Sequence, residues 1–188
     1  MHSNIGIESR AFGFLFISIA IAVLIGTITN ELLSRYHIPI YYQLLLWVMS
    51  FTVILGITFL RMKNTFYSIR NRMKNSIRWP LYAKIINGLS WAGPFLVIPV
   101  FHSFSQYLIL LGIGMGNIST YFLIKSYSNY DNKEQFVVGI IAIFMVPPLL
   151  LIDTVLAHSI IHEHILALSR FFVAASYGMG GIYALIER

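Results

Sequence analysis

The sequence contains no cysteine and few charged residues. Without cysteine, the chain has no disulfide, no thiolate metal site, no iron–sulfur cluster and no thiol nucleophile. Only 11% of its 188 residues are charged and 57% are hydrophobic, whereas an ordinary soluble domain has roughly 25% charged residues. So few charges could not cover a soluble surface. The composition therefore predicts a protein whose apolar residues face lipid.

Catalytic motifs are lacking as well. There is no Gly-x-Ser-x-Gly sequence, and no pair of acidic residues lies deep within an apolar run. A rhomboid-like protease would suit the size, but its serine motif is missing. A retinal protein would need a seventh helix and a deep lysine, whereas Lys84 lies near one end of its apolar run. We therefore expect a chain that is not catalytic on its own.

What the sequence does contain is six apolar runs, each near the roughly 20 residues that a helix needs to cross a bilayer. The first is a span rather than a signal peptide, because no small-residue cleavage site follows it. The prediction is an all-α, polytopic transmembrane helical bundle that forms one integral membrane domain over residues 1–188. The six spans are expected at residues 11–29, 40–60, 81–100, 107–124, 136–155 and 165–186.

Prolines mark the third and fifth spans as irregular. The third contains Pro94 and Pro99, and the fifth contains the Pro147-Pro148 pair. Proline removes a backbone N–H and crowds the preceding helical turn, a distortion that membrane helices tolerate where neighbours satisfy the freed carbonyls. We expect these two spans to be bent or broken.

Basic residues orient the bundle, because lysine and arginine in short loops mark the cytoplasmic side. With six spans and the N-terminus inside, only Arg35 and Arg170 fall outside. The prediction is a cell-membrane protein with both termini in the cytoplasm. The basic residues on the inner side are Arg10, Arg61, Lys63, Arg70, Arg72, Lys74, Arg78, Lys84, Lys125, Lys133 and Arg188.

Residues 61–79 contain six of these basic residues and no acidic one. Their apolar residues recur at helical spacing, which predicts an amphipathic helix on an anionic inner leaflet. A plain stop-transfer loop is the alternative, and nucleic acid is not an expected partner. The apolar positions are Phe66, Ile69, Met73 and Ile77. The expected lipid head-group ligands are Arg70, Arg72, Lys74 and Arg78.

Histidines and acidic residues gather on the outer side of this topology. His158 and His162 are four residues apart, so on a helix they would share one face and could both bind a metal ion. The residue after His158 is Ser159, not the glutamate of a zinc-protease motif. Interfacial side chains that pair with one another are the alternative. The candidate metal ligands are His158, His162, His164, Asp153 and Glu163.

Arg170 is the one basic residue inside the sixth span, about 7 Å along the helix at 1.5 Å per residue. We expect it to snorkel toward the outer surface, or to pair with Asp153 or Glu163.

Small residues mark the fourth and sixth spans as packed helices. Gly112 and Gly116 lie four apart in the fourth, and Gly178 and Gly181 lie three apart in the sixth. Glycines at such spacing let helix backbones approach closely. We expect these spans to pack best, either against each other or against another chain.

The third span carries Asn87 and Trp91 among its apolar residues. They could line a polar pocket, but a buried, hydrogen-bonded asparagine explains them equally well.

Two functional classes remain. The chain could be a non-catalytic subunit of a larger membrane protein complex, or a small-solute binding or transport component. Six spans in 188 residues resemble, in size and topology, the substrate-binding subunits of energy-coupling vitamin importers, although no motif of that family is matched. A transporter should carry polar groups near the bilayer middle, where these spans are nearly all apolar. The sequence therefore favours the subunit.

Overall fold

The computed structural model describes residues 3–34, 36, 39–62, 67, 70, 79–128, 131–155 and 164–187; the side chains of residues 3–8, 34 and 40 are not described. All secondary structure in these ranges is helical, in agreement with the predicted all-α class. The elements are α1 (Ser3–Ser34), α2 (Ile40–Arg61), α4 (Leu81–Val97), the short 3-10 helix η1 (His102–Phe104), α5 (Ser105–Ser128), α6 (Lys133–Phe144), α7 (Val146–Val155) and α8 (Ile165–Ile186).

Within the described ranges, 5 stretches are long and apolar enough to cross a membrane. Each coincides with one of the six predicted spans, which supports an integral membrane protein. The stretches are Ser9–Leu33, Tyr41–Arg61, His102–Ser128, Lys133–Val155 and Ile165–Ile186.

The third predicted span, residues 81–100, is shorter than expected. α4 has 17 residues, ends at Val97 and keeps Pro94 inside it. The chain then turns through residues 98–100, at Pro99, which cannot donate the next helical hydrogen bond. Seventeen residues rise about 26 Å, a little less than the roughly 30 Å hydrocarbon core.

The fifth predicted span is divided in two. α6 ends at Phe144, α7 begins at Val146, and the turn residue Met145 lies between them. The Pro147-Pro148 pair lies in the first turn of α7, and the expected break occurs at the middle of the predicted segment.

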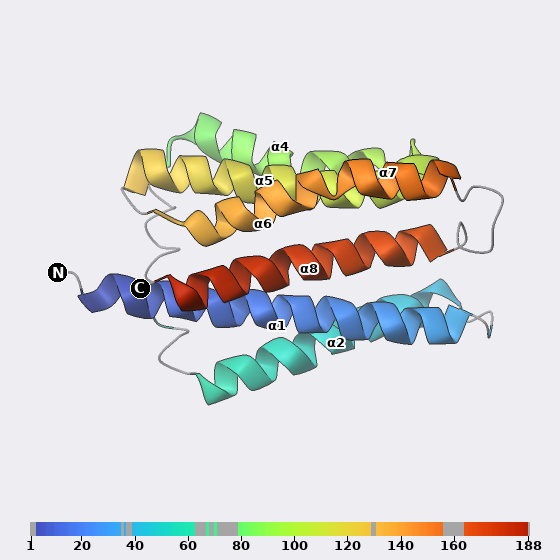
Figure 1. Ribbon diagram of the computed structural model, residues 1–188, viewed down its shortest axis with the longest axis horizontal. Helices are drawn as coiled ribbons and strands as arrows, with labels where there is room; N and C mark the ends of the chain where they lie inside the picture. The colour runs from blue at the N-terminus through green and yellow to red at the C-terminus, as the bar shows by residue number, and fades with distance from the viewer. Residues whose placement is uncertain are drawn as a thin grey trace.

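The helices form an elongated bundle with a simple order of neighbours (Figure 1). α1 packs along both α2 and α8, α8 packs against α6, α6 against α5, and α5 against α4. α2 and α4 therefore lie at opposite edges of the bundle. Successive helices run in opposite directions, except that α7 continues in the direction of α6, and the two termini lie at the same end. We call this end the terminal end and the opposite end the far end.

Candidate functional site

The predicted packing glycines lie at close helix contacts. A Cβ atom on Gly112 would lie 2.6 Å from the Phe95 ring, and one on Gly116 would overlap the ring of Trp91, so both face α4. A Cβ atom on Gly181 would lie 2.9 Å from the carbonyl oxygen of Gly13 in α1. Gly178 is looser, because its nearest neighbour, Ala20, would lie at 3.9 Å.

α5 and α8 also touch each other directly. Asn117 donates from Nδ2 to the Tyr177 hydroxyl at 3.4 Å, and the Ser169 hydroxyl donates to the Gln106 carbonyl at 2.6 Å. The predicted packing glycines of these two helices, however, face α4 and α1, whereas Gly114 and Gly180 face α6. The expected pairing of the two helices therefore runs through polar side chains.

Close contacts also involve glycines outside the predicted set, among them Gly13 and Gly139. Gly13 in α1 faces Gly181, and Gly139 in α6 faces α5, where a Cβ atom would lie 2.9 Å from the carbonyl oxygen of Gly114 and 3.0 Å from the amide nitrogen of Ile118. Neither Gly13 nor Gly139 has another glycine three or four residues away. The spacing pattern that revealed the other glycines could not find them.

A hydrogen-bonded group joins α4 to α5. The Asn87 Oδ1 atom accepts from the hydroxyls of Ser119 at 2.8 Å and Thr120 at 2.9 Å, and Trp91 Nε1 donates to Thr120 at 3.0 Å. The Trp91 ring lies on Gly116. We call Asn87, Trp91, Ser119 and Thr120 the α4 anchor. Of the two expectations for Asn87 and Trp91, a polar pocket or a hydrogen-bonded asparagine, this geometry matches the hydrogen-bonded asparagine.

Asp153 lies near the far end, two residues before the end of α7. Its Oδ2 atom accepts hydrogen bonds from the Tyr107 hydroxyl and, at 3.1 Å, from Gln106 Nε2. Gln106 and Tyr107 are both buried in the first turn of α5. We call these three residues the Asp153 latch. It ties the tip of α7 to the start of α5.

A second polar group at the far end joins α1, α2 and α8. His164 Nδ1 lies 2.8 Å from Glu31 Oε2, and the Arg170 guanidinium lies 5.2 Å from the centre of the Trp47 ring. An arginine over a tryptophan face makes a favourable cation–π contact. Arg170 was expected to snorkel toward the outer surface or to pair with Asp153 or Glu163. The contact described for its side chain is this cation–π contact with Trp47 of α2.

The candidate metal ligands are divided between described and undescribed parts of the chain. His158, His162 and Glu163 lie outside the described residues, whereas Asp153 forms the latch and His164 pairs with Glu31. Where side chains are described, no group of three or more histidine and acidic residues could hold a metal ion. The metal site therefore remains a prediction that depends on the undescribed histidines.

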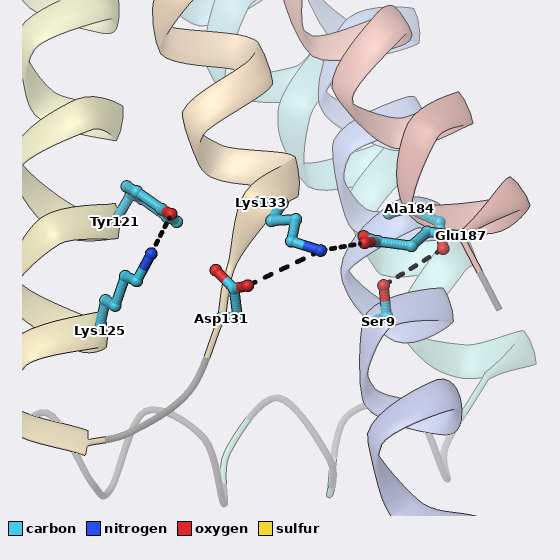
Figure 2. Close-up of polar contacts among 7 residues, drawn as sticks. All are labelled: Ser9, Tyr121, Lys125, Asp131, Lys133, Ala184 and Glu187. Carbon is cyan, nitrogen blue, oxygen red and sulfur yellow. Dashed lines mark hydrogen bonds and ion pairs between the residues drawn. The ribbon is translucent and has the colours of Figure 1, made fainter.

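Two lysines near the terminal end have polar partners (Figure 2). Lys133 Nζ lies between two acids, 2.7 Å from Glu187 and 3.7 Å from Asp131, and Lys125 donates to the Tyr121 hydroxyl at 3.1 Å. Of the four predicted head-group ligands, Arg70 is described and is exposed. The other three, Arg72, Lys74 and Arg78, lie outside the described residues, as does most of the predicted amphipathic helix.

Glu134 is a buried acid that the sequence did not distinguish from a loop residue. Its side chain is 1% exposed in the first turn of α6, and the neighbouring Asn132 is buried as well. An acidic side chain in the first turn is favoured by the helix dipole. Glu134 lies between the predicted fourth and fifth spans, residues 107–124 and 136–155, so its position gave no signal of burial.

Polar side chains in this bundle thus join helices in pairs: α4 to α5, α5 to α8, α7 to α5, and α1 to α2 through Ser18 and Thr58 at 2.6 Å. Buried hydrogen bonds of this kind stabilise membrane helix packing.

A comparison with known proteins finds no matching protein-family model, no matching curated protein and no matching solved structure.

Proposed function

We propose that the chain is a non-catalytic integral membrane subunit of a larger membrane protein complex. The observation that carries this proposal is the use of the interior polar groups. The α4 anchor, the Asp153 latch and the Asn117–Tyr177 pair each join one helix to another. Side chains used in this way favour a scaffold, because a solute site needs polar groups directed at the solute.

The edges of the bundle supply surfaces for other subunits. Among the described residues, α2 packs mainly on α1 and α4 mainly on α5. Their remaining faces carry large exposed apolar side chains, such as Leu44 and Val48 on α2 and Leu89 and Leu96 on α4. Within a membrane these faces contact lipid tails or the helices of a partner, and the proposed subunit would use them for partners.

The proposed location is the cell membrane, with the terminal end in the cytoplasm. Arg10, Arg61, Lys84, Lys125 and Lys133 all belong to this end in the arrangement of Figure 1, whereas Arg170 lies toward the far end. Basic residues concentrate on the cytoplasmic side of membrane proteins. Anionic head groups of the inner leaflet would then lie beside these cations.

Purification from native membranes in a mild detergent tests the proposed function. We expect other membrane proteins to copurify in fixed stoichiometry, and the complex to survive size-exclusion chromatography. Exchanging Leu89 and Leu96 on α4 for alanine should weaken such a complex if α4 forms the interface. A monodisperse single chain from the same membranes would contradict the proposal.

A small-solute binding or transport component is the second candidate, and the division of α6 from α7 favours it. Discontinuous membrane helices form the solute sites of many transporters. The break at Met145 is followed by the Pro147-Pro148 pair within a single candidate span. A purified monomer that binds a vitamin-sized ligand would support this candidate over the first.

A metal ion at the far end is a separate expectation that we retain. If His158 and His162 bind a metal, elemental analysis of the purified protein should find about one metal ion per chain, and His158→Ala with His162→Ala should remove it. His102→Ala is the matched control, because His102 is exposed and lies on η1. Metal at background level in the native protein would eliminate the site.

A further inference from the structure

The membrane-crossing segment formed by α6 and α7 consists of two helical pieces joined at Met145. Proline has no N–H, so Pro147 and Pro148 cannot donate to the carbonyls of Ile143 and Phe144, four residues before each of them. Backbone bonding resumes where Leu149 donates to the Met145 carbonyl at 3.1 Å. With two consecutive helical hydrogen bonds absent, this is the weakest point of the segment.

The two pieces are held very differently. α6 buries Glu134, Val138, Gly139 and Ala142, and Gly139 lies directly against the backbone of α5. α7 buries a single side chain, Leu149. Pro147 and Pro148 themselves are exposed. α6 is therefore fixed in the bundle by its packing, whereas α7 packs on the core less extensively, with Val146 and Ile152 only partly buried against it.

The far end of α7 is held by the Asp153 latch. The residues that bind Asp153 are themselves fixed: the Gln106 side chain also donates to the Ser103 carbonyl at 3.1 Å, and the Gln106 carbonyl accepts from Ser169 of α8 at 2.6 Å. The latch thus joins the tip of α7 to α5, at a point where α5 is itself hydrogen-bonded to α8.

We propose that α7 is a hinged half-helix, which pivots at Met145 and is held closed by the hydrogen bonds that Asp153 accepts from Gln106 and Tyr107. When the latch opens, α7 moves away from α5 while α6 stays in place. This movement opens the far end of the bundle beside Gln106 and Ser169. The inference concerns the motion of one helix and does not depend on the proposed function.

Distances between spin labels on α7 and α5 test the hinge, and the absence of native cysteine lets each label be placed at a chosen residue. One label pair joins Leu151→Cys on α7 to Ser126→Cys on α5, and a control pair joins Phe144→Cys at the end of α6 to the same Ser126→Cys. All three residues are exposed. In the otherwise native chain, we expect one narrow distance distribution for each pair.

Removing the latch should affect only the α7 pair. Hydrogen bonds to a charged group each change an equilibrium by about tenfold or more, so Asp153→Ala should raise the ratio of released to latched α7 at least about tenfold. The Leu151–Ser126 distribution then gains longer distances, while the Phe144–Ser126 distribution keeps its width. Thr154→Ala is the matched control, because Thr154 is exposed and bonds only within α7.

Two further variants keep the test decisive. If Asp153→Ala does not fold, Tyr107→Phe removes one latch bond, keeps the ring and should broaden the α7 pair to a smaller degree. Replacing both Pro147 and Pro148 with alanine restores two backbone donors, so it should return the narrow distribution to the Asp153→Ala chain. An unchanged α7 pair, equal broadening of both pairs, or failure of this rescue would overturn the proposal.

Discussion

Gly139→Ala and Gly181→Ala are each expected to lower the free energy of unfolding by about 1–3 kcal/mol, the usual cost of overpacking a tight interior. The added Cβ atom would lie 2.9 Å from a carbonyl oxygen and 3.0 Å from an amide nitrogen of the neighbouring helix, in both cases. Backbone atoms cannot rotate aside as a side chain can. The α5–α6 and α1–α8 pairs must therefore separate to accept the methyl group.

Gly88 provides a matched control, at which alanine is not expected to lower stability. Gly88 lies in α4, and a Cβ atom added there would have no neighbour within 4 Å. Because alanine is favoured over glycine in a helix by up to about 1 kcal/mol, Gly88→Ala should leave stability unchanged or raise it. Reversible unfolding in mixed detergent micelles measures all three variants. Equal effects at Gly88 and Gly139 would show that close backbone contact does not hold these helices.

Trp91→Ala is expected to destabilise the protein by about 2–3 kcal/mol, somewhat less than the roughly 3–5 kcal/mol typical of a fully buried tryptophan. Trp91 is only partly buried, but its ring fills the space over Gly116 and its Nε1 atom donates to Thr120. Trp91→Phe keeps most of the ring and loses the hydrogen bond, so it should cost about 1 kcal/mol.

Leu89→Ala provides the comparison on the opposite side of α4. The Leu89 side chain is 61% exposed, and lipid tails are as apolar as leucine, so its truncation removes little net stabilisation in a membrane. In thermal unfolding in the same detergent, the midpoint temperature of Trp91→Ala should lie well below that of Trp91→Phe. The midpoint of Leu89→Ala should lie near that of the native protein. A Leu89→Ala effect as large as that of Trp91→Ala would contradict the α4 anchor.

Hydropathy was sufficient to locate the helices, because the length and apolar character of a span follow from the bilayer itself. The observed helix bounds differ from the predicted spans near the prolines. Pro99 ends α4 early, and the break before Pro147 and Pro148 divides the fifth span. Proline positions indicated where irregularity would occur, but the neighbouring helices determine whether a proline is accommodated, as Pro94 is inside α4.

The partners of individual side chains were less accessible to sequence reasoning. Asp153 was a candidate metal ligand or partner of Arg170, and its hydrogen bonds with Gln106 and Tyr107, which lie 47 and 46 positions away, were not expected. Glu134 lies outside every predicted span and is nevertheless buried. Such contacts depend on how helices pack together, and apolar spans carry little pattern that specifies their neighbours. The two glycines outside the spacing pattern, Gly13 and Gly139, were missed for the same reason.

The central proposal is a six-crossing bundle with its terminal end in the cytoplasm, and it depends on whether α4 crosses the membrane. Single cysteines at Tyr36, Arg70, His102 and Asp131, all exposed, can be tested with a membrane-impermeant thiol reagent in the cysteine-free chain. A six-crossing bundle in this orientation should be labelled at Tyr36 and His102 in intact cells, and at Arg70 and Asp131 only after permeabilisation. Labelling of Arg70 and His102 from the same side would show that α4 does not cross, and would contradict the six-crossing bundle.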